Sequence, residues 1–352
     1  PDLTIEILKP DRNAASGQYV CRLYSPRSLA TPLGPFDVQL GTEAKAFAKQ
    51  LVDDVRVSSR SVLVDNTLEG IGLLIAERLP REVFDAIAEI GVAMKPETPA
   101  VLIVSVEPYV PWELAWMQSP LDPARPSFLG AQVLLGRWLR DDARPPRPGA
   151  GEPAVMRPAL HPSAQAKVRH MAAMAAWYLP TAGLSRLPNA EAETKRLVER
   201  CGAVPLPASA DAMRDLLKGT VAQGSDVIGR VQAVHFAGHG DFDPSRPDGS
   251  ALFLSDGTPL RSTIFRSASY GGEHQPLLFL NACMLGIGGE VLGDMAGFPG
   301  NSLRGGFGAV LGALWEVDDK VAHDIALAFW EAALPQAPGR GQPIGSVLRD
   351  LR

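Results

Sequence analysis

Alternation of apolar and polar residues marks the start of the chain. The segments LTIEIL and YVCRLYSP alternate with the period of two that is typical of half-buried strands, and the polar turn KPDRNAASGQ joins them. We therefore expect an antiparallel hairpin. Residues 43–55 carry apolar side chains at helical spacing, and residues 67–90 form a second helical region that Pro80 breaks or kinks. The run AVLIVSV has the length and β-branched composition of a buried strand.

The second half of the chain alternates between apolar runs and amphipathic segments. Strands are predicted for HMAAMAAWY and for residues 231–237, 252–254, 277–282 and 306–315. Helices are predicted for residues 190–200, 211–223 and 319–334. Strands that alternate with helices in this way favour a mostly parallel sheet covered on both faces. The expected fold class is therefore α/β.

A boundary between two parts is predicted at RDDARPPRPGAGEPAVMRPALHP, which has too much proline and glycine for regular structure. We interpret residues 141–162 as a linker or long surface loop between residues 1–140 and residues 163–352. A chain of 352 residues is long enough for two such parts. Because it does not begin with methionine and stops inside the helical pattern GSVLRDLR, we expect it to be a piece of a longer protein.

Composition disfavours several classes of function. The net charge is −5 and no basic cluster forms a stripe, which argues against direct binding of nucleic acid or an anionic membrane. No stretch approaches the ~20 apolar residues of a membrane span, and the first residues are not a secretory signal. Cys21, Cys201 and Cys283 lack CxxC spacing, which argues against disulfides and a thiolate zinc site. We expect a cytoplasmic protein without metal or cofactor.

Two of the predicted strands end on reactive side chains. HFAGHG carries His239 between Gly238 and Gly240, just past the strand at 231–237, and LLFLNAC ends on Cys283. In open α/β sheets, reactive groups gather at the carboxyl ends of strands. His239 precedes Cys283 by 44 positions, enough for one short excursion between neighbouring strands. We therefore expect the two side chains to lie close together.

This pair of residue types favours nucleophilic catalysis. An imidazole accepts the proton of a thiol, or stabilises the thiolate, and later protonates a leaving amine. The backbone N–H groups of Gly240 and Cys283 are the candidate donors to an oxyanion. Taken singly, each residue has an ordinary interpretation, because free cysteine is often buried in the core and a histidine between glycines also suits a turn. His235, inside the strand, is interpreted as a core residue.

Five segments in fixed order resemble the CHAT domains, caspase-like cysteine proteases of clan CD that are related to separases. They span about residues 100–334 and read VPWELAW, LPNAEAE, HFAGHG, LLFLNAC and GGFGAVLGALWEVDD. The resemblance implies a three-layer α/β/α sandwich for the catalytic half at 163–352, preceded by a pseudo-protease, regulatory half at 1–140. It also implies the catalytic roles of His239 and Cys283 and the oxyanion role of the Gly240 N–H. Gly238 departs from the Cys or Ser that often precedes the family's histidine, and a polar pair is missing after Cys283.

The resemblance further implies a substrate-binding pocket. Separases place an acidic residue of the Trp-x-Val-x-Asp region where a basic side chain binds, which here points to Asp318 or Asp319, with Trp315 as a wall. Both aspartates also stand where the last predicted helix begins, and aspartate is a favoured N-cap residue. Trp315 equally suits a packing role.

The leading hypothesis is a cysteine endopeptidase that cleaves specific protein partners, under the control of a sensor or repeat domain or a regulatory protein. Some members of the family that the chain resembles act in bacterial defence or programmed death. The alternative is a catalytically silent scaffold that binds protein partners. Two weaker hypotheses are a nucleotide loop at Gly306-x-Gly308-x-x-x-Gly312, which lacks the required strand-then-helix context, and a zinc site of His235 and His239, whose spacing suits a helix.

Overall fold

The computed structural model describes the chain as two compact units, residues 1–140 together with 343–352, and residues 141–342. The described residues are all except 12, 13, 16, 42, 43, 59–61, 141–167, 179, 243–248, 271–274, 284–288, 292, 293, 315 and 335–340. The predicted linker at 141–162 and the predicted pocket residue Trp315 therefore lie outside the described residues.

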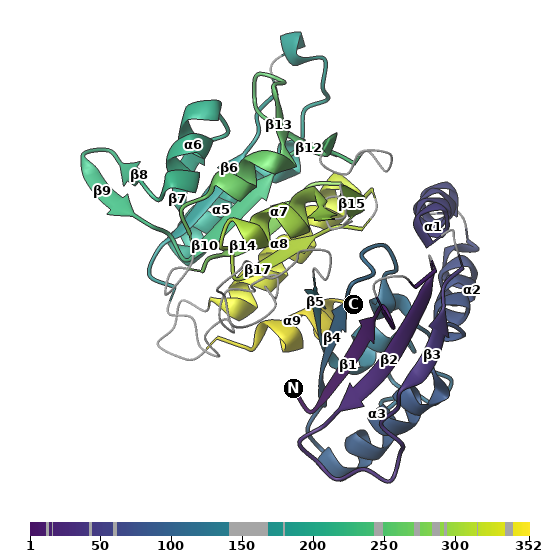
Figure 1. Ribbon diagram of the computed structural model, residues 1–352. Helices are drawn as coiled ribbons and strands as arrows, with labels where there is room; N and C mark the ends of the chain where they lie inside the picture. Colours follow the sequence, from purple (N-terminus) through teal and green to yellow (C-terminus); the bar gives the residue numbers. More distant parts are fainter. Residues whose placement is uncertain are drawn as a thin grey trace, which may run out of the picture. The chain divides into compact units, whose positions relative to one another are not determined.

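The first unit contains a five-stranded mixed sheet in the order β3-β2-β1-β4-β5 (Figure 1). Strands β1 (Leu3–Leu8), β2 (Gln18–Tyr24) and β3 (Phe36–Gln39) are antiparallel neighbours, whereas β4 (Ala100–Ser105) and β5 (Leu134–Leu139) continue the sheet in parallel with β1. Alternate residues of β1 are buried, as its period of two predicts. The predicted N-terminal hairpin is confirmed.

The helices of the first unit are α1 (Ala44–Ser58), α2 (Val64–Ala76), α3 (Arg81–Met94), η1 (Trp112–Leu114), α4 (Leu129–Gln132) and α9 (Ile344–Leu351). Helices α1, α2 and α3 lie in the regions that apolar spacing predicts, whereas η1 and α4 were not predicted. The helical region around Pro80 is two helices, because proline cannot continue a helix and instead stands at the N-cap of α3. Helix α9, which comes from the end of the chain, contacts β5 and α4, and Arg125 donates a hydrogen bond to Asp350 at 2.7 Å.

The second unit is built on a five-stranded sheet in which all neighbours are parallel. Its order is β17 (Ala309–Gly312), β14 (Leu277–Asn281), β10 (Ala233–Ala237), β6 (Met171–Ala175) and β7 (Val204–Pro207). Every residue of β10 is buried, as expected for a central strand covered on both faces. The predicted parallel sheet is confirmed.

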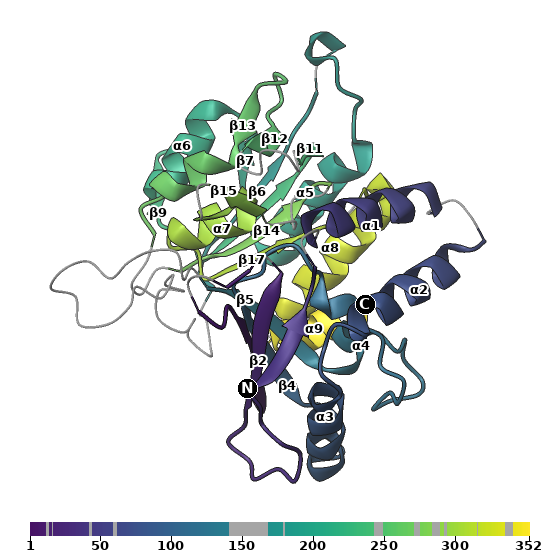
Figure 2. The same ribbon diagram turned by 45° about the vertical axis from the view of Figure 1, so that its right-hand side comes forward.

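Helices cover both faces of this sheet (Figure 2). Val234 and Phe236 of β10 join a core with side chains of α6 (Ala210–Lys218) and α7 (Gly297–Arg304). His235, between them, points to the opposite face, where its ring contacts Trp330 of α8 (Asp319–Ala333). Helix α5 (Pro188–Cys201) contacts α8 on that face. The second unit is thus the expected three-layer α/β/α sandwich.

The second unit also contains short antiparallel ladders. They are β8 (Val221–Gln223) with β9 (Asp226–Gly229), β11 (Gly240–Asp241) with β12 (Ala251–Phe253) and β13 (Pro259–Arg261), and β15 (Gly289–Val291) with β16 (Asp294–Ala296). The 3₁₀ helices η2 (Pro180–Ala182) and η4 (Ser262–Ser267) accompany them. The helix predicted for 211–223 ends earlier, because Gly219 adopts a left-handed C-cap at φ 69°.

The glycine run before β17 serves packing. A Cβ atom at Gly305 would lie 1.9 Å from the carbonyl oxygen of Phe265, so only glycine fits there. The run leads into a strand instead of opening a helix, which is the wrong context for a nucleotide loop. In the described part of the chain, no helix has the length and apolar character needed to cross a bilayer.

Candidate active site

His239 and Cys283 follow neighbouring parallel strands at the same step. Ala237, the last residue of β10, is the register partner of Asn281, the last residue of β14. The N–H of Gly238 donates to the carbonyl oxygen of Asn281 at 3.2 Å, which continues the pairing one residue further. His239 and Cys283 each stand two residues past the Ala237–Asn281 pair. Their backbone positions therefore lie at the same carboxyl edge, over adjacent strands.

The imidazole of His239 is oriented by a main-chain group. Its Nε2 lies 2.8 Å from the carbonyl oxygen of Ser185 and 3.2 Å from the Ser185 hydroxyl. Because a carbonyl oxygen only accepts hydrogen bonds, Nε2 carries the proton, and Nδ1 is the unprotonated nitrogen of the neutral ring. Among the hydrogen bonds between described residues, none joins His239 to Cys283. Ser185 was not predicted from the sequence.

Tyr178 also holds the histidine segment. The N–H of His239 donates to the Tyr178 hydroxyl at 2.7 Å, and this hydroxyl donates to the carbonyl oxygen of Phe253 at 2.9 Å. The two rings are stacked obliquely, with centroids 4.9 Å apart. Burial raises the pKa of Tyr178 to about 12, so the phenol keeps its proton across the physiological range. The hydroxyl thus bridges two strand segments and fixes the backbone of His239.

The same tyrosine accounts for Gly238, the position at which the chain departs from the family pattern. A Cβ atom at Gly238 would lie 2.8 Å from the Tyr178 hydroxyl and 2.9 Å from Cε1 of Phe236. Real Cβ atoms do not approach other atoms so closely. The space that a cysteine or serine side chain needs is therefore filled by Tyr178 in this protein.

The N–H of Gly240 points away from β12, the strand that pairs with β11. Gly240 is paired with Leu252 across the antiparallel β11–β12 ladder, and the N–H of Phe253 donates to the carbonyl oxygen of His239 at 3.1 Å. Hydrogen-bonded pairs alternate with non-hydrogen-bonded pairs in such a ladder. Since His239 and Phe253 form a hydrogen-bonded pair, the Gly240–Leu252 pair is of the other kind. This orientation suits a donor to a bound group.

Cys283 is a free, half-buried cysteine. Burial is the main cause that raises the pKa of its thiol above the ordinary value, and the carboxylate of Glu316 raises it further. The N–H of Val317, bonded to the sulfur, and the N–H of Cys283 itself oppose this rise. The resting side chain is therefore a thiol at neutral pH, and it needs a base before it reacts as a nucleophile.

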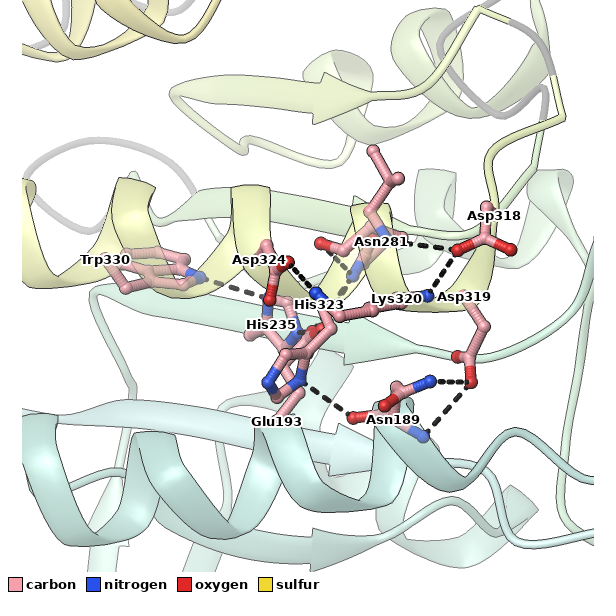
Figure 3. Close-up of polar contacts among 12 residues, drawn as sticks. Asn189, Glu193, His235, Asn281, Asp318, Asp319, Lys320, His323, Asp324 and Trp330 are labelled. Atoms are coloured by element: carbon pink, nitrogen blue, oxygen red, sulfur yellow. Dashed lines mark hydrogen bonds and ion pairs between the residues drawn. The ribbon is translucent and has the colours of Figure 1, made fainter. Parts of the chain in front are cut away.

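The two predicted pocket aspartates have structural contacts (Figure 3). Asp318 is the N-cap of α8, where its Oδ1 accepts hydrogen bonds from the N–H groups of Lys320 and Val321 at 2.9 and 3.3 Å. Oδ2 of Asp319 accepts from the backbone N–H and the side-chain amide of Asn189 at 3.1 and 2.8 Å. Asp318 thus begins α8, and Asp319 ties it to the start of α5.

His235 and His239 have separate sets of partners. His235 is fully buried, accepts a hydrogen bond from Trp330 Nε1 at its Nδ1 (3.0 Å), and is hydrogen-bonded through Nε2 to Glu193. Its interpretation as a core residue agrees with this burial. Within the described residues, no group of three or more histidine, cysteine, aspartate or glutamate side chains is arranged to hold a metal ion.

The parallel sheet between two helical layers, with a histidine and a cysteine just past its carboxyl edge, defines a caspase-like α/β protein. A sequence model of the CHAT domain matches residues 109–350, which is more than half of the chain. The chain belongs to the CHAT domain family, and the resemblance seen in the sequence is confirmed.

Solved structures of cysteine proteinases are similar over most of the chain. The complex of Porphyromonas gingivalis RgpB pro- and mature domains aligns with a TM-score of 0.46 and 12% identity, covering 87% of this chain and 71% of that one. The Arg-specific cysteine proteinase gingipain R aligns with a TM-score of 0.47 and 13% identity, covering 87% and 69%. A search of curated protein sequences finds no match.

Proposed function

We propose that the protein is a cysteine endopeptidase in which Cys283 is the nucleophile and His239 the general base. The register pair Ala237–Asn281 carries this proposal, because it sets the two residues over adjacent strands at one edge of the sheet. Membership of the CHAT family supports it further.

In the first step of the proposed reaction, the Sγ proton passes to Nδ1 of His239, which the Ser185 carbonyl leaves unprotonated, while the sulfur attacks the carbonyl carbon of the peptide bond. The resulting oxyanion accepts hydrogen bonds from the N–H groups of Gly240 and Cys283. The intermediate collapses, the C–N bond breaks, and the imidazolium gives its proton to the leaving amine. Water, deprotonated by His239, then hydrolyses the thioester and restores the thiol.

The raised pKa of Cys283 favours a particular order of events. Because the resting thiol keeps its proton, an ion pair of thiolate and imidazolium is not the resting state. Proton transfer then accompanies attack on a bound carbonyl, as in general base catalysis. The Ser185 carbonyl stabilises the imidazolium that forms, since it already accepts the Nε2 proton.

For substrate recognition, we propose Asp318 as the acidic contact of a basic side chain. It is exposed and directly follows Val317, whose N–H contacts the nucleophilic sulfur. Asp319 is the weaker candidate, because its carboxylate already binds Asn189. Trp315 remains the proposed pocket wall.

We also propose protein substrates, with activity controlled by a sensor or repeat domain or a regulatory partner, in bacterial defence or signalling. This part of the proposal rests on the family resemblance. Within it, residues 1–140 are assigned the regulatory, pseudo-protease role.

A second candidate function is a non-catalytic scaffold that binds protein partners. The observation in its favour is the raised pKa of the Cys283 thiol, because burial of this kind is typical of an unreactive core cysteine. The two candidates differ in one respect that is easily measured, namely whether a thiol-reactive probe labels Cys283 in preference to Cys21 and Cys201 at neutral pH.

The deciding experiment is a peptide-library cleavage profile of the wild-type protein beside Cys283→Ala and His239→Ala. We expect cleavage by the wild type and its loss in both variants, with circular dichroism spectra that remain unchanged. Cleavage by Cys283→Ala at the wild-type rate contradicts the proposal.

A further inference from the structure

A buried polar cluster joins four elements of the second unit (Figure 3). It consists of Glu193 on α5, His235 on β10, Asn281 on β14 and Trp330 on α8. The side chains of Glu193 and His235 have no exposed surface. Removing a carboxylate from water costs several kcal/mol unless hydrogen-bond donors replace the water. The cluster therefore persists only if its donors and acceptors match.

The donors and acceptors of the cluster can be assigned from Trp330. Its indole N–H is only a donor, so Nδ1 of His235 is an acceptor and carries no proton. The neutral imidazole then carries its proton on Nε2 and donates it to Oε1 of Glu193. Both Glu193 oxygens also face the side-chain amide nitrogen of Asn281, at 3.0 and 2.9 Å. Both oxygens of the Glu193 carboxyl group thus face hydrogen-bond donors.

Asn281 connects this carboxyl group to both proposed catalytic residues. It is the last residue of β14 and stands two positions before Cys283. Its main-chain carbonyl accepts the N–H of Gly238, the residue before His239, at 3.2 Å. Its side chain is held by Glu193. A shift of Asn281 thus moves the segment that carries Cys283 relative to the one that carries His239.

The cluster also holds the start of α8, which follows the segment that contacts the sulfur. The amide nitrogen of Asn281 donates to the carbonyl oxygen of Ala322 at 3.1 Å. Nδ1 of His323 donates to the carbonyl oxygen of Asn189 at 3.0 Å and lies 3.9 Å from Oε2 of Glu193. Glu193 and Asn189 belong to the segment LPNAEAE, to which the proposed reaction assigns no role.

We propose that Glu193 is a positioning residue: its buried carboxyl group holds the Asn281 side chain and thereby sets Cys283 against His239. This inference rests on the proposed Cys283–His239 dyad and assigns Glu193 no contact with substrate. Replacement of a buried ion pair by well-packed apolar residues is often neutral or stabilising, so such a cluster is weak evidence for a role in stability alone. The matched donors and acceptors of the cluster fit a requirement for one fixed geometry at Asn281.

The test measures the rate at which iodoacetamide alkylates Cys283, followed by peptide mass spectrometry. In Glu193→Gln, the new NH₂ group faces the amide nitrogen of Asn281, donor against donor, and we expect the rate at Cys283 to fall at least about tenfold. Combining Glu193→Gln with Asn281→Asp restores a donor–acceptor match, because the new amide donates to the new carboxylate. We expect this double variant to recover a large part of the lost rate, short of the wild-type rate because the donor to Ala322 is missing.

Cys201, the last residue of α5, reports in the same molecule on loosening of the helix that carries Glu193. We expect its alkylation rate to stay unchanged in these variants. Glu107→Gln is the control in the first unit, because Glu107 also has a fully buried carboxyl group, which accepts hydrogen bonds from the N–H groups of Tyr109 and Val110 and whose pKa is raised by burial. If Glu193→Gln does not fold, Asn281→Ala removes the same link while His235 still donates to Glu193.

The outcomes separate this inference from the proposed function. A slower reaction of Cys283 in His239→Ala and in Glu193→Gln, with rescue in the double variant, supports both. A slower reaction in His239→Ala alone overturns only the role of Glu193. The role of Glu193 is also overturned if the alkylation rate of Cys283 falls equally in Glu193→Gln and in the double variant while Cys201 is alkylated faster. The substitutions have then loosened the fold. No change in His239→Ala overturns the dyad and the inference together.

Discussion

The carbonyl oxygen of Ser185 lies 2.8 Å from Nε2 of His239 and fixes which ring nitrogen is protonated. A main-chain group performs this task, where an enzyme with a catalytic triad uses a carboxylate. The arrangement leaves Nδ1 as the basic nitrogen. The group that orients the imidazole at Nε2 is thus an uncharged carbonyl.

The first prediction separates the carbonyl of Ser185 from its hydroxyl. In Ser185→Ala the main-chain contact remains, so we expect His239 to keep its proton on Nε2 and peptide cleavage to fall by no more than about fivefold. Nitrogen-15 NMR of histidine-labelled protein measures the tautomer directly. A change to the Nδ1-protonated form in the variant contradicts the assigned role of the carbonyl.

The second prediction concerns the bridging hydroxyl of Tyr178. Tyr178→Phe leaves the N–H of His239 and the carbonyl of Phe253 without this partner, and we expect a loss of about 1–3 kcal/mol in the free energy of unfolding together with slower cleavage. Tyr270→Phe is the control, because the Tyr270 hydroxyl donates to the carbonyl oxygen of Leu216, which belongs to α6 and not to the His239 segment. Urea denaturation should show losses in both variants, whereas cleavage should slow in Tyr178→Phe alone. Equal cleavage by the two variants excludes a positioning role for Tyr178.

The third prediction distinguishes the capping role of Asp318 from its proposed binding role. Asp318→Asn keeps a side-chain acceptor for the first turn of α8 but removes the charge, so we expect unchanged stability and a reduced preference for basic residues at the cleaved bond. Asp318→Ala should in addition lose about 1 kcal/mol of stability through loss of the cap. Thermal unfolding and a peptide-library profile measure the two effects. A full preference for basic residues in Asp318→Asn removes this residue from the pocket.

The fourth prediction follows from the pKa of Cys283. Because the Glu316 carboxylate raises the pKa of the thiol, Glu316→Gln should lower it, and the pH profile of Cys283 alkylation should move toward lower pH. The folded protein holds the thiol proton more tightly than the unfolded chain does. This group's contribution to stability therefore declines as the pH rises above the ordinary thiol pKa, and Glu316→Gln should weaken the decline. An alkaline shift of the profile contradicts the electrostatic assignment.

The long apolar runs of the sequence predict the central strands of both sheets. Strands such as β4 and β10 are buried on at least one face along their length, so their composition alone distinguishes them. The shortest elements escaped prediction. Strand β11 has only two residues, and β7 carries two prolines, so neither shows a period that propensity or alternation can detect.

The residues of the candidate site likewise include some that the sequence predicts and some that it does not. The sequence predicts His239 and Cys283 as site residues, because a reactive residue just past an apolar run is recognisable in the sequence. No sequence pattern predicts Ser185 or Tyr178. Ser185 contacts His239 through its main-chain carbonyl oxygen, and the Tyr178 hydroxyl lies between two strand segments. The role of Glu193 also depends on partners from three other elements, which no local pattern in LPNAEAE specifies.

The proposed dyad is tested most directly by a peptidyl acyloxymethyl ketone, a probe that a cysteine captures when a bound peptide places the reacting carbon beside its sulfur. Wild type, His239→Ala and Cys283→Ala are treated at neutral pH, and the modified residue is identified by mass spectrometry. We expect a thioether at Cys283 in the wild type, formation slowed at least about a hundredfold in His239→Ala, and none in Cys283→Ala. Modification of Cys201 instead, or an equal rate at Cys283 without His239, contradicts the account.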